Sequence, residues 1–321
     1  MRVLSGVQPS GTLHIGNYFG MMKPAIALQE QGEAFLFIAN YHALTSVHEG
    51  GLLREMTRDV ALDFLACGID PERTAFYRQS DVPQVHELAW LLSVLTPMGL
   101  LERCHSFKDK TARGIAASHG LFAYPVLMAA DILAVNATVV PVGRDQKQHV
   151  EVTRDLAMRF NHVFGVEVFV LPEPSIQETV AVVPGIDGQK MSKSYNNTIE
   201  IFGSGKPLKK RIMKVVTDSK GLDDPKDPEG CNVFALYKLF ADAEQQAELA
   251  ERYRAGGMGY GHAKTALWEL MEAYFEPMRE RRLALEKDPD FVEDVLRTGA
   301  KRASAVAEDV LGRAREAVGL V

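Results

Sequence analysis

The sequence predicts an α/β protein in which a parallel-sheet domain is followed by an all-helical domain. In the first 185 residues, short apolar runs alternate with segments of helical periodicity, as in a parallel sheet covered by helices. After residue 205 strand-like runs nearly vanish and long helical stretches take over. We therefore divide the chain into a sheet domain at 1–185, a linker at 186–205 and a helical domain at 206–321.

The expected strands are short apolar runs bounded by turn residues. They are residues 2–7, 34–39, 74–79, 138–142 and 168–171. Helices are expected between them at 52–67, 84–95 and 145–160, and after the linker at 234–253, 262–285 and 290–318. The first of these is the clearest, because Leu53, Met56, Val60 and Phe64 recur at the spacing of one helix face. The glycine-rich segment 254–262 is expected to be a loop between helices.

Composition places the chain among ordinary globular proteins, with 46% hydrophobic and 24% charged residues. We find neither an apolar run long enough to span a bilayer nor a signal-peptide pattern, so we expect a cytoplasmic protein without membrane contact. Cys67, Cys104 and Cys231 form no CxxC pair, which argues against a disulfide framework or a zinc site. The net charge of −6 argues against a protein that coats nucleic acid nonspecifically.

A local basic face is still compatible with that charge. Five cations lie close together in the segment GKPLKKRIMK at 205–214, namely Lys206, Lys209, Lys210, Arg211 and Lys214. Two interpretations stay open, a solvated helix face and a contact with a polyanion.

The first motif with chemical content is GVQPSGTLHIGNYFG at residues 6–20. A strand leads into a turn, and HIGN then opens a helix, whose N-terminus presents unpaired N–H groups to an anion. Gly16 allows a base or ribose to approach the backbone, and His14 and Asn17 share one face of the first turn. The structural alternative is a tight turn with a capping histidine.

The second motif is KMSKS at residues 190–194, inside a loop rich in glycine and polar residues. Two ammonium groups on such a loop, Lys190 and Lys193, suit a triphosphate whose charge shifts during reaction. The alternative is an exposed basic loop without a ligand.

Together the two motifs resemble the HIGH and KMSKS elements of class I aminoacyl-tRNA synthetases, with Asn17 in place of the second histidine. The segments QPSGTLHIGN, YPVLMAADIL (124–133), PVGRDQKQHVE (141–151) and KMSKS narrow the resemblance to the tryptophanyl enzymes of the bacterial type, over essentially the whole chain. This resemblance implies a Rossmann-like catalytic domain for ATP and tryptophan at 1–185, the KMSKS loop and linker at 186–205, and a helical domain at 206–321 that binds the tRNA anticodon.

The resemblance also implies site residues. Those implied to act in catalysis are His14, Asn17, Lys108, Lys190 and Lys193. Those implied to bind ATP are Gln8, Pro9, Ser10, Gly16, Asn17, Gly143, Arg144, Asp145, Gln146, Val182, Lys190, Met191, Ser192, Lys193 and Ser194. Those implied to bind tryptophan are Gln8, His42, Tyr124, Met128 and Asp131. For Asp145, capping the following helix is a second possible role.

The choice of amino acid depends on Met128 and Asp131, which share a face of one predicted helix. An indole offers one N–H donor and a large apolar body, and a carboxylate beside a polarizable methionine suits both. Tyrosyl enzymes typically carry glutamine where Met128 stands. For Met128 alone, core packing is the simpler explanation, whereas a carboxylate in so apolar a helix needs a partner.

Three positions depart from the pattern of the relatives: Asn40 where Asp is frequent, Ser106 where some have Gln, and Leu4 where some have Phe. They bear on details of the pocket. The resemblance further implies Mg²⁺ held mainly by the ATP phosphates, tRNA(Trp) as the partner and a homodimer. The alternatives considered are a tyrosyl-tRNA synthetase, a small-molecule nucleotidyltransferase and a non-catalytic synthetase paralogue.

Overall fold

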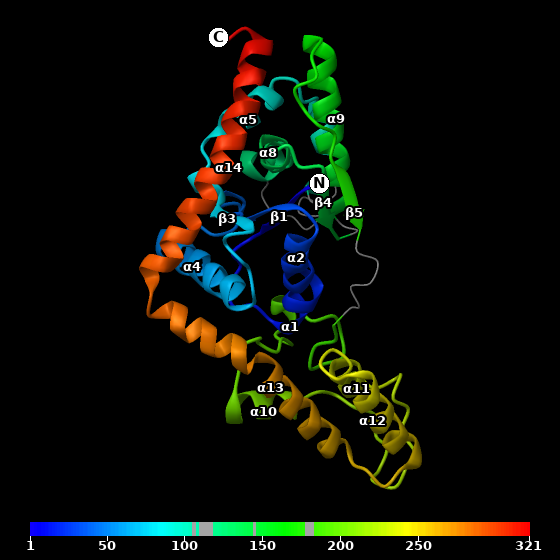
Figure 1. The fold of residues 1–321 in the computed structure, drawn as a ribbon. Coiled ribbons are helices and arrows are strands. Elements are labelled where there is room, and N and C mark those ends of the chain that lie inside the picture. The colour runs from blue at the N-terminus through cyan, green and yellow to red at the C-terminus, as the bar shows by residue number, and fades with distance from the viewer. Residues whose placement is uncertain (105–106, 109–117, 144–145, 177–182) are drawn as a thin grey trace.

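The computed structural model describes residues 1–104, 107–108, 118–143, 146–176 and 183–321. Five parallel strands form one sheet in the order β3-β2-β1-β4-β5 (Figure 1). The strands are β1 Arg2–Val7, β2 Glu33–Ile38, β3 Thr74–Arg78, β4 Val139–Val142 and β5 Glu173–Ile176. Helices pack on the sheet, and β2 and β3 are buried almost throughout, whereas β5 is only partly buried.

Four predicted strands are confirmed to within one residue at either end, and the fifth is wrong. Residues 168–171 do not join the sheet, and β5 begins at Glu173 instead. The reason is Asn161, whose side chain binds the backbone N–H groups of Val168 and Phe169 and the carbonyl of Phe169. The apolar side chains of Val168 and Phe169 pack into the core from this loop.

The helices alternate with the strands in the first part of the chain, and the helical stretches follow. They are α1 Ile15–Asn17, α2 Lys23–Ala27, α3 Asn40–Ala43, α4 Gly50–Ala66, α5 Gln84–Ser93, α6 Met98–Glu102, α8 His119–Ala134, α9 Lys147–Phe164, α10 Gly205–Ile212, α11 Asn232–Tyr237, α12 Ala243–Ala255, α13 Tyr260–Glu286 and α14 Pro289–Val318. The stretch predicted as one helix at 234–253 is two. Asp242 and Gln245 form a capping box that starts α12 afresh. The loop expected at 254–262 is confirmed between α12 and α13, although it is shorter than predicted.

The last helix returns to the sheet. Gly299 of α14 lies directly on Phe76 of β3, and a Cβ at this glycine would stand 2.0 Å from the Phe76 carbonyl oxygen. Small residues at Ala300, Ala303 and Ala307 continue this close packing. Figure 1 shows α14 alongside the sheet, while α10, α11, α12 and most of α13 lie at the other end of the molecule. Residues 206–321 are thus divided between two places.

Across the described ranges, none of the helices is both long and apolar enough to span a bilayer.

Candidate functional site

The strand order places a switch point between β1 and β4, the two strands from which the chain proceeds in opposite directions across the sheet. Open parallel sheets bind ligands at the carboxyl ends of the strands beside such a point. A cavity of about 460 Å³ lies there. The Phe37 ring, which forms one wall of the cavity, packs directly against Gly6. A Cβ at this position would collide with the ring at 2.5 Å.

The walls of this cavity are mostly apolar, with a few polar groups. Its lining residues are Leu4, Ser5, Gly6, Gln8, Met21, Phe37, Ala39, His42, Thr45, Leu121, Tyr124, Met128, Ile132, Val140, Pro141, Val142, Gly143 and Gln146. Among the predicted tryptophan-binding residues, Gln8, His42, Tyr124 and Met128 therefore meet around one space. An apolar pocket with few convergent polar groups is the ordinary form of a small-molecule site.

Asp131 lies behind this wall and is buried at 4% exposure. Its Oδ2 is 2.8 Å from His42 Nε2, and Gln79 donates from Nε2 to both carboxylate oxygens at 2.9 Å. Gln79 also accepts from the Tyr41 N–H, so the turn after β3, α3 and α8 are joined through one buried carboxylate. The partner that a carboxylate in an apolar helix requires is thus a pair of side chains.

Two residues that hold the predicted tryptophan-binding side chains from behind were missed by sequence reasoning. One is Gln79, which follows β3 and whose only sequence signal is its place at a strand end. The other is His149 of α9, whose Nε2 is 2.6 Å from the Tyr124 hydroxyl. His149 stands in the PVGRDQKQHVE segment but shows no periodicity that distinguishes it from core residues. Tyr124 is therefore held from behind by a neighbouring helix.

His14 caps the short helix α1 and is buried. Its ring Nδ1 accepts from the Asn17 backbone N–H at 3.2 Å, and its backbone N–H donates to Asn17 Oδ1 at 3.2 Å. Burial, and next the charge of Lys193, lower the pKa of His14 to about 4. The ring is thus neutral near pH 7, and because Nδ1 accepts a hydrogen bond, its proton is on Nε2, which can donate one.

The KMSKS loop lies against the HIGN turn. Lys193 Nζ donates to the Ser10 carbonyl at 2.7 Å and approaches Ser10 Oγ at 3.4 Å, across 183 residues of sequence. The Ile15 N–H donates to the Ile199 carbonyl at 2.9 Å. A Cβ at Gly16 would stand 3.4 Å from that of Met191. The two motifs, both predicted to suit phosphate, therefore lie side by side.

The loop is held from within by Asn197, which is 1% exposed. Its Oδ1 accepts from the Ser192 N–H at 2.8 Å, and its Nδ2 donates to Asp187 Oδ1 at 2.8 Å and to the Lys190 carbonyl at 3.1 Å. Sequence reasoning missed this residue, because the dipeptide Asn196–Asn197 is also typical of an ordinary turn. Asn197 fixes the backbone that carries both lysines.

The two lysines differ in their surroundings. Burial lowers the pKa of Lys193, and the charge of Asp63 partly opposes this shift. Lys190 is exposed at the edge of the loop. Ser192 and Ser194 face each other with 2.8 Å between their hydroxyl oxygens. Both lysines are thus exposed, and they differ in that Lys193 contacts the turn that follows β1, through Ser10.

The remaining predicted residues are only partly described. Arg144, Asp145 and Val182 lie outside the described residues, as does Ser106 among the departures. Lys108 is exposed, with its backbone N–H on the Cys104 carbonyl. Leu4 lines the cavity, whereas the Asn40 amide pairs with Ser80 where β2 and β3 end. In the part of the chain that the structure describes, no three His, Cys, Asp or Glu side chains are grouped to hold a metal ion.

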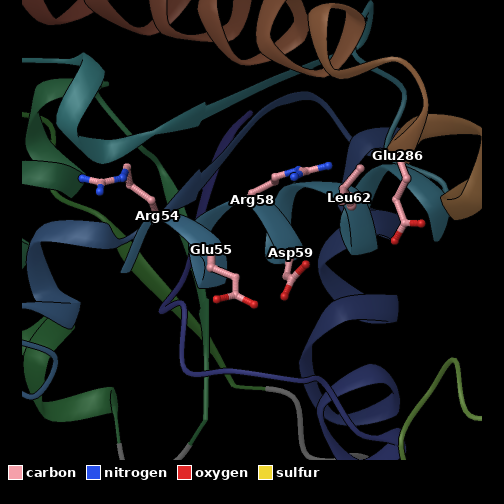
Figure 2. A pocket seen from close by; sticks show the side chains of 6 residues that line it. All are labelled: Arg54, Glu55, Arg58, Asp59, Leu62 and Glu286. Carbon is pink, nitrogen blue, oxygen red and sulfur yellow. The ribbon is translucent and has the colours of Figure 1, made fainter. Parts of the chain in front are cut away.

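A second hollow of about 370 Å³ lies beside α4 (Figure 2). It is lined by Arg54, Glu55, Arg58, Asp59, Leu62 and Glu286. Arg282 of α13 pairs with Asp59, Asp63 and Glu286, so acidic groups near this hollow serve to join α4 to α13. None of the residues predicted for the site lines it.

Comparison with known proteins gives a family and close relatives. Residues 1–276 match the family described as class I tRNA synthetases (W and Y). A tryptophan–tRNA ligase of Rhodopirellula baltica is 56% identical over 320 residues, covering 100% of both chains. One of Fusobacterium nucleatum is 54% identical, covering 100% of this chain and 98% of its own.

Solved structures agree. The tryptophanyl-tRNA synthetase of Campylobacter jejuni, complexed with ADP and tryptophan, superimposes with a TM-score of 0.95 at 54% identity, covering 99% of this chain and 100% of that chain. The enzyme of Mycoplasma pneumoniae does so with a TM-score of 0.81 at 30% identity, covering 100% of this chain and 98% of that chain.

Proposed function

The chain belongs to the class I tRNA synthetases for tryptophan and tyrosine and is a tryptophan–tRNA ligase, and we propose how its residues share that reaction. L-Tryptophan is activated with ATP to tryptophanyl-adenylate and pyrophosphate, and tryptophan is then transferred to tRNA(Trp). The observation that carries the assignment of residues is the Lys193–Ser10 contact, which joins the two phosphate motifs beside an apolar cavity.

Tryptophan occupies the cavity at the ends of β1 and β4. Its indole lies between the apolar walls and Met128, and its N–H is directed toward Asp131. His42 and Gln79, which share this carboxylate, hold it in place. A carboxylate has about four acceptor positions, so these two partners leave room for the indole donor. Gln8, whose amide donates to the His42 carbonyl, faces the tryptophan carboxylate and the α-phosphate.

ATP lies across the HIGN turn and the KMSKS loop. The tryptophan carboxylate attacks the α-phosphorus, a bond forms between its oxygen and phosphorus, and pyrophosphate leaves. Lys190 and Lys193 balance the charge that develops on the leaving phosphates, and His14 donates from Nε2. No side chain forms a covalent intermediate, so placement and charge stabilisation supply the rate. Mg²⁺ would be held mainly by the ATP phosphates and would help to neutralise their charge.

The same proposal extends to the partners. An exposed apolar row from the end of α5 to the start of α6, with Trp90, Val94 and Met98 each more than 60% exposed, supports a homodimer. The region formed by α10, α11, α12 and α13 binds the tRNA anticodon, and the enzyme works in the cytoplasm.

The proposal is tested by charging tRNA(Trp) with labelled tryptophan, with tyrosine as the control. We expect ATP-dependent charging with tryptophan and none above background with tyrosine. Charging with tyrosine would favour the related enzyme, and exchange without charging would point to a paralogue that only activates the amino acid.

A further inference from the structure

One face of α10 carries a row of lysines. Lys206 and Lys210 lie four residues apart on the helix, and Lys214 follows after four more in the turn beyond it. All three are exposed, whereas Leu208 and Ile212 are buried on another face of the same helix. At 1.5 Å of rise per residue, neighbouring lysines are separated by about 6 Å along the axis. The spacing therefore forms a ridge of positive charge, inclined to the helix axis and continued by the turn after it.

The cations beside this row are used within the protein. Lys209 Nζ lies 4.3 Å from the centre of the Trp268 ring of α13. Arg211 donates to the Thr198 carbonyl at 2.8 Å and to the Asn196 carbonyl at 2.6 Å, just beyond the KMSKS loop. The ammonium groups of Lys206, Lys210 and Lys214 differ from these. In the described ranges, none of the three has a carboxylate within ion-pair distance or donates a hydrogen bond to another group.

An unneutralised row of this kind works against the helix, because like charges four residues apart repel each other. The chain as a whole has 42 acidic and 36 basic residues, so carboxylates to neutralise the row are plentiful. A partner that supplies negative charge at regular intervals would relieve the repulsion between the lysines, and the contacts would stabilise the complex.

We propose that the lysine row Lys206–Lys210–Lys214 binds the phosphate backbone of the tRNA substrate, an inference that rests on the proposed function. Lysine is a point charge on a flexible stem, so the row grips phosphates and reads no bases. Sequence recognition then belongs to other surfaces of the helical region. Because Arg211 on the same helix holds the backbone at the end of the KMSKS loop, the bound RNA lies next to the segment that carries Lys190 and Lys193.

A charge-matched pair of variants tests this. Lys206→Gln with Lys210→Gln removes two charges from the row, and Lys287→Gln with Lys301→Gln removes two exposed charges elsewhere. We measure the KM for tRNA(Trp) in aminoacylation between 50 and 200 mM salt, and tryptophan-dependent pyrophosphate exchange without tRNA. Over this range of salt concentration, the affinity of a protein for nucleic-acid phosphates falls steeply.

The row variant should raise the KM for tRNA about tenfold and lower the slope of its salt dependence by about 2, while exchange stays within about twofold. Adding Lys214→Gln should increase both effects. The proposal would be overturned if the row variant had a KM for tRNA no higher than that of the Lys287–Lys301 control. This would hold even if the row variant bound other polyanions, such as heparin or an anionic vesicle, less well than the control does. If the unmodified enzyme charged no tRNA, the proposed function itself would fail, which is a separate outcome.

Discussion

The cavity proposed for tryptophan and the phosphate site proposed for ATP are built in different ways. The cavity is framed by strands and by α8, and its buried network of Asp131, His42 and Gln79 joins three elements. The phosphate site consists of two loops distant in sequence, joined at Lys193 and Ser10 and by a few backbone contacts. We infer that the first is formed before the substrate arrives, while contacts in the second are exchanged for contacts with ATP. Substitutions in the cavity should therefore affect selectivity for the amino acid, and substitutions in the two loops should affect the rate of activation.

The largest effect should follow Lys193→Ala. Loss of one preorganised charge at the leaving phosphates should slow tryptophan-dependent pyrophosphate exchange by about 100-fold or more, with little change in the KM for tryptophan. Lys287→Ala, an exposed lysine at the end of α13, provides the control. An exchange rate equal to that of the control would remove Lys193 from the reaction.

Asp131→Asn should act on the other region. Hydrogen bonds to a charged acceptor contribute about 1.5–3 kcal/mol, so the loss should raise the KM for tryptophan by about 10- to 100-fold. The KM for ATP should stay constant, because the carboxylate contacts His42 and Gln79 rather than the loops. Steady-state kinetics with each substrate varied in turn separates the two. A rise confined to the KM for ATP would place the indole elsewhere.

Asn197→Ala should give a smaller effect, again on the phosphate site. Three hydrogen bonds that hold the KMSKS loop are lost, and the KM for ATP in the exchange assay should rise by about tenfold. Asn161→Ala is the matched control, because Asn161 also holds a loop by three hydrogen bonds. Both variants should unfold at lower temperature, but only Asn197→Ala should alter the KM for ATP. Equal kinetics in both would reduce Asn197 to a structural role.

Patterns in the sequence predicted the strands and the two motifs, but they did not predict the side chains that hold the site from behind. HIGN and KMSKS were each predicted to suit phosphate, and the structure brings them together, since Lys193 contacts Ser10. The four strands with continuous apolar runs were predicted almost to the residue. Gln79, His149 and Asn197 were missed, since each acts through a partner far along the chain or through its own loop backbone. The fifth strand was wrong because an asparagine side chain, which no periodicity reports, holds residues 168–169 in a loop.

The smallest effect concerns pH and His14. The pKa of this ring is about 4 in the folded protein, against an ordinary value near 6.5, so the unfolded chain binds the extra proton first as pH falls. The stability that the neutral ring contributes is full above pH 6.5 and is lost as pH falls toward 4. Asp63, whose burial raises its pKa to about 6, acts with the opposite sign, so the unmodified protein alone cannot isolate the effect.

Comparison with His14→Gln isolates it. Between pH 6.5 and 4, the free energy of unfolding from urea titrations should fall by about 1 kcal/mol more in the unmodified protein than in the variant. This figure is below the full shift because solvent near the turn screens part of the interaction. Exchange activity should show no titration of His14 between pH 6 and 8, since the ring is already a neutral donor there. Parallel stability curves for the two proteins would mean that His14 is not held neutral by burial, and the phosphate site would then gain a third cation below pH 6.5.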